Sequence, residues 1–311
     1  MLPENGGSAM LFLILLTLLC VLFLSYIAYW IAFYNPVYRH HEAVVIHVKQ
    51  EPDCFNNLCR SMENRRYEQI QIRGFDGVAL VGRYYHQCDG APLFILFHGY
   101  RGNGIRDFCA VHGICSKLGI NTLVVDQRAH GSSGGNTMTF GILERYDCRA
   151  WAHYACRRFG TEQKIYLHGV SMGAATVLMA SNLSLPSNVA GIIADCPYSC
   201  PGLIIRKVIR DMHFPPSMLY PFVVLGAMIF GRFRIWEEKP AHAVSETKIP
   251  ILLLHGSDDK YVPSEMSAEI FEQCSGKRYL EIFPGAGHGG CSVTDPIRYE
   301  KVLRAFMKNC K

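Results

Sequence analysis

The stretch with the clearest chemical potential is the Gly-x-Ser-x-Gly pattern at residues 169–173, with Ser171 at its centre. An alternating apolar run that begins at Lys164 precedes it and predicts a buried strand, and Ala174 to Ser181 predicts a helix directly after it. A serine on so sharp a turn has strained backbone geometry, and small neighbours let the strand and the helix approach closely. The pattern predicts a nucleophilic serine, although by itself it also fits an ordinary serine at a strand-to-helix turn.

Strands and helices alternate on both sides of this turn. The predicted strands lie at 93–97, 122–125, 164–170, 189–194, 251–254 and 279–283, and the predicted helices at 106–118, 142–159, 174–181, 265–274 and 295–309. A hairpin of two strands, at 68–73 and 78–85, precedes the alternation. Such alternation predicts an α/β fold with a mostly parallel sheet and helices on both faces.

The alternation breaks at Pro197, and from there to about Ala243 the chain reads as helical and apolar. The apolar run at 214–231 could be a second membrane span. It is short, however, and three prolines fall within it, which disfavours a spanning helix. We therefore interpret residues 197–243 as a helical cap inserted over the sheet.

Residues 9–34 carry no charged side chain and are long enough to cross a hydrocarbon core of about 30 Å as a tilted helix. Because the segment lacks the positive start and the cleavage site of a signal peptide, we predict one transmembrane helix. Arg39 and Lys49 follow it and no basic residue precedes it. The positive-inside rule then predicts a single-pass membrane protein with its main domain in the cytoplasm.

The sequence therefore predicts four parts. Residues 1–8 form a short N-terminal tail, 9–34 the transmembrane helix, 35–67 a juxtamembrane connector with a short helix near 55–65, and 68–311 the main domain with its cap.

Composition excludes several classes of protein. The net charge is only +5, and the basic residues are scattered without interleaved aromatic residues, so we expect no nucleic-acid partner. Thirteen cysteines show no zinc-site spacing and no histidine pattern of the finger type. We interpret them as reduced thiols in a reducing compartment, with a disulfide framework as the alternative. We expect neither a metal nor a cofactor.

Reactive groups of an open parallel sheet lie on loops at the carboxyl ends of its strands. The loops with candidate groups are His98–Gly102, Asp126–Gly131, Ser171 itself, His255–Pro263 and Pro284–Gly290. A serine hydroxyl becomes a good nucleophile when a histidine takes its proton and a carboxylate holds that imidazole in one tautomer. The loops after the strands at 251–254 and 279–283 supply such groups, including Asp258, Asp259 and His288.

Serine, acid and histidine in this order, each after a strand, resemble the α/β-hydrolases over roughly residues 68–310. The motifs that carry the resemblance are HGYRG, DQRAHGSSGG, HGVSMGAA, ADCP, HGSDDKYVP and GAGHG, and their order is similar to that in bacterial membrane-anchored serine aminopeptidase-like or lysophospholipase-like hydrolases. The resemblance implies Ser171 as nucleophile, His288 as base and Asp259 as acid, with the adjacent Asp258 as the alternative acid.

The resemblance also implies an oxyanion hole. Its donors would be the backbone N–H groups of Met172, which follows the nucleophile, and of Tyr100, which follows the first His-Gly pair. The remaining histidines at strand ends and turns are interpreted as structural: His98, His130, His168 and His255.

These patterns together predict a membrane-anchored serine hydrolase that cleaves a carboxylic ester or a related acyl bond through an acyl-Ser171 intermediate. The substrate would be a hydrophobic or acyl small molecule, and the apolar run at 218–230 favours a lipid-like ester. A serine peptidase or a thioesterase would use the same fold, and a non-catalytic scaffold on a hydrolase fold is a further alternative. A peptidase would need an acidic site for the substrate amine, for which Glu237 and Glu238 are the candidates.

Overall fold

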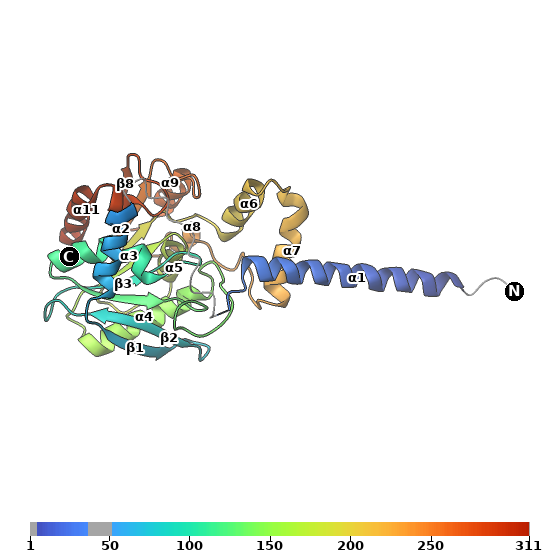
Figure 1. Cartoon of the computed structure of the whole chain (residues 1–311), viewed down its shortest axis with the longest axis horizontal. Helices are drawn as coiled ribbons and strands as arrows, with labels where there is room; N and C mark the ends of the chain where they lie inside the picture. The colour runs from blue at the N-terminus through green and yellow to red at the C-terminus, as the bar shows by residue number, and fades with distance from the viewer. Residues whose placement is uncertain (1–4, 37–51, 311) are drawn as a thin grey trace.

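The predicted alternation of strands and helices is present in the computed structural model, which describes residues 5–36 and 52–310 (Figure 1). The strands are β1 (Glu68–Arg73), β2 (Ala79–Tyr85), β3 (Leu93–Phe97), β4 (Asn121–Asp126), β5 (Ile165–Val170), β6 (Val189–Asp195), β7 (Ile251–Gly256) and β8 (Arg278–Phe283). They form one 8-stranded sheet in the order β1-β2-β4-β3-β5-β6-β7-β8. β2 is antiparallel to β1 and β4, and the other pairs are parallel, so the predicted mostly parallel sheet is confirmed.

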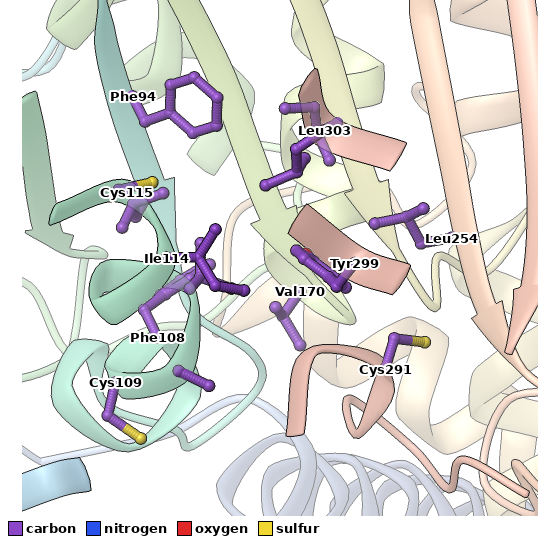
Figure 2. Packing of buried hydrophobic residues seen from close by; sticks show 14 of the residues in the cluster. Phe94, Phe108, Cys109, Ile114, Cys115, Val170, Leu254, Cys291, Tyr299 and Leu303 are labelled. Atoms are coloured by element: carbon purple, nitrogen blue, oxygen red, sulfur yellow. The ribbon is translucent and has the colours of Figure 1, made fainter. Parts of the chain in front are cut away.

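Helices cover both faces of the sheet because its central strands are apolar on both sides. One face carries α3 (Gly104–Lys117), α10 (Cys291–Thr294) and α11 (Pro296–Asn309), and the other carries α4 (Glu144–Phe159), α5 (Met172–Ala180), α8 (Pro240–Ala243) and α9 (Ser264–Gln273). Successive side chains of a strand point to opposite faces. Accordingly, Phe94 of β3 joins the cluster of α3 and α11, whereas Ile95 joins that of α4 and α5. Figure 2 shows the first cluster, to which Ile114 of α3 and Leu303 of α11 contribute.

The predicted helix of the connector is α2 (Pro52–Glu63). It buries Phe55 and Met62 in the same cluster as α3, so this helix packs on the main domain. Arg39 and Lys49, on which the predicted orientation depends, lie outside the described residues.

The N-terminal helix α1 (Asn5–Ala32) extends away from the rest of the chain (Figure 1). Within its Gly7–Ala32 stretch, a window of 18 residues has a mean hydropathy of 2.8 and is almost entirely exposed. Among the described residues, it is the one helix long and apolar enough to cross a membrane. The predicted spanning segment is therefore a continuous helix up to Ala32.

The predicted cap contains two main helices, α6 (Pro201–Asp211) and α7 (Pro216–Ile229). α7 has 14 residues, about 21 Å at 1.5 Å per residue, which is too short to cross about 30 Å of hydrocarbon. It packs beside the domain end of α1 (Figure 1), and a Cβ at Gly226 would lie only 2.5 Å from the Ser25 carbonyl oxygen. The small residue at 226 lets the two helix backbones touch.

Candidate active site

Ser171 lies between the end of β5 and the start of α5, in a backbone conformation with φ 54° and ψ −115°. This left-handed φ is uncommon for a residue with a side chain and marks a strained turn. The residues at 169 and 173 must be glycine, because a Cβ at either position would clash with backbone atoms. A Cβ at Gly173 would lie 1.9 Å from the Phe97 carbonyl oxygen, and one at Gly169 would lie 2.1 Å from the Gly173 oxygen.

The close approach predicts a large difference between two glycine substitutions. Gly173→Ala should lower the free energy of unfolding by on the order of 3 kcal/mol, because backbone rather than a flexible side chain occupies the space. Gly113→Ala, inside α3 with no atom within 4 Å of the new Cβ, should raise it by about 0.5–1 kcal/mol. Thermal denaturation in detergent compares the two variants. Equal stability of both variants would contradict the packing argument.

The predicted nucleophile, base and acid lie on one line of hydrogen bonds, although the acid and the base are far from Ser171 in the sequence. His288 Nε2 lies 2.8 Å from Ser171 Oγ, and His288 Nδ1 lies 2.7 Å from Asp259 Oδ2. Asp259 follows β7 and His288 follows β8, so the parallel sheet brings both loops to the edge where Ser171 lies. This geometry lets the imidazole accept the serine proton while the carboxylate holds its other nitrogen.

Asp259 is placed to stay ionised. Burial opposes its charge, but hydrogen bonds to His255 and His288, and from the Val262 N–H, hold the pKa of Asp259 well below its usual range. Its Oδ1 accepts the Tyr261 and Val262 N–H groups at 2.8 and 2.9 Å. With Oδ1 bound in the turn, Oδ2 faces His288 at 2.7 Å and His255 at 3.3 Å.

The alternative acid, Asp258, makes a different contact. Its Oδ1 accepts the Ser257 hydroxyl at 2.9 Å, and its N–H donates to the Ala286 carbonyl at 2.9 Å. Of the two adjacent carboxylates, Asp259 is the one that contacts His288.

The two predicted oxyanion donors flank Ser171. Met172 is the first residue of α5, where a backbone N–H has no partner within the helix. Tyr100 lies on the loop after β3, which passes Ser171 so closely that a Cβ at Gly99 would lie 3.4 Å from the serine Cβ. Within the described part of the chain, no hydrogen bond uses the Tyr100 N–H. Their role as oxyanion donors stays a prediction from the resemblance.

A buried polar network shapes the Tyr100 loop, and one of its members was not predicted. The Asp107 carboxylate accepts the Gly99 N–H at 2.7 Å, and its burial raises the pKa of this carboxyl. The sequence signal for Asp107 was a carboxylate in the first turn of the helix after the His-Gly loop. His98 Nε2 accepts the Gln127 N–H at 3.1 Å, and His130 Nε2 accepts the Arg101 N–H at 3.1 Å.

Two other histidines also hold structure together. His255 is fully buried and contacts Ser267 Oγ at 2.6 Å, the Val262 carbonyl at 2.9 Å and Asp259 Oδ2 at 3.3 Å. Burial lowers the pKa of His168 to about 3, so its ring stays neutral and contacts the Tyr299 hydroxyl at 3.0 Å. His255 thus supports the acid directly, a contact that the sequence did not indicate.

Asp195, the last residue of β6, is a buried carboxyl that the predicted site did not include. Its backbone oxygen accepts the Ser171 N–H at 2.8 Å. Its Oδ1 has no hydrogen-bond partner among the described residues. Burial raises the pKa of Asp195 from 3.8 to about 6, although a hydrogen bond with Cys291 opposes the shift.

The raised pKa of Asp195 predicts a pH-dependent stability. Between pH 3.8 and about 6, the unfolded chain has lost this proton and the folded chain keeps it, so folded stability falls as the pH rises through this window. The contribution of Asp195 to this fall should be on the order of 3 kcal/mol, and Asp195→Asn should remove that contribution from the pH profile of unfolding. The exposed Asp89→Asn control should keep the wild-type slope. An unchanged slope in Asp195→Asn would contradict the assignment.

One group of metal-ligating residue types occurs in the described part of the chain, namely Cys196, Asp259 and His288. Asp259 and His288 are already hydrogen-bonded to each other, and His288 also contacts Ser171. Burial raises the pKa of the Cys196 thiol well above its usual range, which disfavours the thiolate that a metal would need. The donor set therefore fits the hydrogen-bonded line better than a metal ion.

The acidic pair considered for a peptidase is already occupied. Arg145 Nη2 lies 3.0 Å from Glu237 Oε1, and Arg145 Nη1 lies 3.1 Å from Glu238 Oε2. These ion pairs tie the base of the cap to α4. They leave the two carboxylates poorly placed to receive a substrate amine.

Comparison with known proteins agrees with this architecture. Residues 92–247 match the family described as the alpha/beta hydrolase fold. The protein YqkD of Bacillus subtilis is 26% identical over 263 residues, which cover 84% of this chain and 86% of YqkD. Protein bem46 of Schizosaccharomyces pombe is 25% identical over 251 residues, which cover 78% of this chain and 77% of bem46.

Solved structures show the same fold. The Pyrococcus furiosus esterase Pf2001 superposes with a TM-score of 0.64 at 24% identity, covering 89% of this chain and 99% of its own. Est1E of Butyrivibrio proteoclasticus with bound ferulic acid superposes with a TM-score of 0.61 at 22% identity. The match covers 78% of this chain and 98% of the Est1E chain. From its sheet order, its strand-to-helix turn at Ser171 and its match over residues 92–247, the chain belongs to the α/β hydrolase fold family.

Proposed function

We propose that this protein is a membrane-anchored serine hydrolase that cleaves carboxylic esters through an acyl-Ser171 intermediate. The observation that carries the proposal is the continuous hydrogen-bonded line from Ser171 through His288 to Asp259, at 2.8 and 2.7 Å. Nucleophile, base and acid at these distances are the parts that acyl transfer to serine requires.

The proposed reaction has two halves. Ser171 Oγ attacks the ester carbonyl carbon as its proton passes to His288 Nε2, and the resulting oxyanion accepts the N–H groups of Met172 and Tyr100. The C–O bond to the alcohol then breaks, and His288 returns the proton to the leaving oxygen. In the second half, water attacks the acyl-Ser171 carbonyl with His288 again as base, releasing the acid and restoring the serine.

The membrane part of the proposal rests on α1 and its surroundings. The exposed apolar surface of α1 continues onto the cap through α7, where Met218 is 66% exposed and Ile229 is 45% exposed. Exposed apolar patches of this kind mark protein or membrane contacts. If α1 spans the bilayer, α7 lies at the level of Ser25 and Tyr29, close to lipid. A cytoplasmic location of the main domain remains a prediction from the positive-inside rule.

The same surroundings favour a lipid-like acyl ester. The apolar cluster beneath the cap combines Met172, the neighbour of Ser171, and Val262 with Ile205 of α6 and Phe233. An acyl group that reaches Ser171 would meet apolar side chains of this cluster, which suit it better than a charged group. A monoacylglycerol or a lysophospholipid is the substrate class that we propose.

Hydrolysis of a matched ester series by the full-length protein in detergent tests the proposal. Soluble esters of increasing acyl length should show kcat/KM rising with chain length, and amides and thioesters of the same acyl groups would reveal peptidase or thioesterase activity. Turnover confined to short soluble esters would overturn the lipid-like substrate. Faster turnover of the amide or thioester would replace the ester assignment.

A further inference from the structure

The end of α1 is hydrogen-bonded to the loop that carries Tyr100. The Tyr100 hydroxyl donates to the Ala32 carbonyl at 3.0 Å, and Arg101 Nη2 donates to the Ile31 carbonyl at 2.8 Å and to the Tyr34 carbonyl at 3.4 Å. The last carbonyls of a helix lack intrahelical donors and carry partial negative charge, so a guanidinium is a favourable partner for them. We call this set of hydrogen bonds the α1–loop contact.

The last turn of α1 is itself fixed in the domain. Phe33 is fully buried and packs edge-on against Phe140 and Phe233, with ring centroids at 5.8 and 5.1 Å. The Phe33 carbonyl accepts the Met138 N–H at 2.8 Å, and the Asn35 side chain donates to the Ala129 carbonyl at 2.6 Å. These contacts fix the end of α1 relative to the domain, so groups that hydrogen-bond to its last carbonyls are fixed as well.

The Tyr100 peptide is held at several points. Arg101 has φ 50°, a left-handed conformation that is costly for a residue with a side chain, and its N–H donates to His130 Nε2 at 3.1 Å. Burial raises the pKa of Tyr100 to about 12, so its hydroxyl stays protonated and able to donate at neutral pH. The Tyr100 ring packs against Phe140 with centroids at 5.1 Å. Without the α1–loop contact, this loop would lose three of its hydrogen bonds.

We propose that the last turn of α1 is a structural part of the active site, and that Arg101 and the Tyr100 hydroxyl are positioning groups that aim the Tyr100 N–H at the oxyanion. The inference rests on the proposed function, because it assigns a role in that reaction to the helix end. In this proposal α1 does more than anchor the protein in the membrane, because its final carbonyls set the geometry of one oxyanion donor. Hydrogen-bond donors stabilise an oxyanion only when they are aimed at its position.

Three substitutions in the full-length protein in detergent test the α1–loop contact. Arg101→Met removes two hydrogen bonds and keeps most of the side-chain volume, Tyr100→Phe removes one and keeps both the ring and the backbone N–H, and Arg101→Lys retains the positive charge. Deleting one oxyanion donor costs about 100- to 1000-fold in kcat. Misaligning one should cost less, so we expect about 10- to 100-fold for Arg101→Met and a smaller loss for Tyr100→Phe.

The readout separates positioning from general stability. With a short soluble ester, kcat should fall while KM stays within about twofold, because the oxyanion forms only after binding. A trifluoromethyl ketone, whose adduct with Ser171 carries the oxyanion, should bind more weakly by the same factor by which kcat falls. Arg101→Lys should recover part of both losses. The control is Arg304→Met, on an exposed part of α11 where Arg304 pairs with Glu300, and it should match the wild type.

The results for these variants distinguish a failure of the α1–loop contact from a failure of the proposed function. Unchanged kcat and unchanged ketone affinity in Arg101→Met and Tyr100→Phe would overturn the role of the α1–loop contact, as would a raised KM with constant kcat. If Arg101→Met does not fold, the near-isosteric Tyr100→Phe decides by the same criteria. A wild-type rate equal to that of Ser171→Ala would instead overturn the proposed function, and the role of the contact with it.

Discussion

Replacing Ser171 with alanine should abolish hydrolysis, lowering kcat by about 10⁶-fold. The substitution removes the oxygen that would form the proposed acyl-enzyme, and it leaves His288 without the hydroxyl that lies 2.8 Å from its Nε2. The substitution removes only the Oγ atom and leaves the surrounding side chains in place, so substrate should still bind. Initial rates on the best ester of the series, measured with full-length protein, give the comparison.

Ser245→Ala is the matched control for this prediction. Ser245 is exposed after the cap, and its hydroxyl donates to the nearby His242 carbonyl at 2.7 Å. This variant should keep the wild-type rate and melting temperature. A Ser171→Ala protein that hydrolyses the ester within about tenfold of wild type would show that another group performs the chemistry.

Asp259→Asn should lower kcat by about 10⁴-fold. The amide is nearly isosteric but uncharged, so it would neither stabilise the imidazolium that forms on His288 nor enforce the Nδ1–H tautomer. The ionised state of Asp259 is the one that the site supports, because its pKa is held well below the usual range. KM should change little, since the Asp259 side chain is fully buried behind His288, which it contacts at 2.7 Å.

The adjacent residue supplies the control for Asp259. Asp258→Asn changes the same functional group one position away, where it contacts Ser257 instead of His288, and it should stay within a few-fold of wild type. The reverse ranking, with Asp258→Asn more damaging than Asp259→Asn, would contradict the geometry of the acid.

Local patterns explain how much of this site could be predicted from the sequence. Residues 169–173 predict the turn, because neighbouring elements pack so closely there that only small residues fit. The mostly parallel pairing followed from the alternation of elements, whereas the strand order became known only from the structure. The choice between Asp258 and Asp259 depended on a resemblance, because adjacent carboxylates differ only in which N–H groups the turn offers them.

The contacts that escaped prediction join residues that are distant in the sequence or lack a pattern of their own. Arg101 reaches the carbonyl of Ile31, 70 residues earlier, and no periodicity of α1 indicates which loop its last turn will meet. Asp107 and Asp195 are single carboxylates whose importance comes from full burial rather than from spacing. Such contacts emerge only once the sheet has brought the loops together.

Covalent labelling by a fluorophosphonate is the most direct test of the central claim that Ser171 is an activated nucleophile. Membranes containing wild-type protein would be treated with the probe, digested, and the modified residue located by mass spectrometry, beside Ser171→Ala and Asp259→Asn. We predict labelling of wild type at Ser171, none in Ser171→Ala and slow labelling in Asp259→Asn. Folded wild-type protein that stays unlabelled, or that is labelled equally in Ser171→Ala, would contradict the assignment and favour a non-catalytic role for this hydrolase fold.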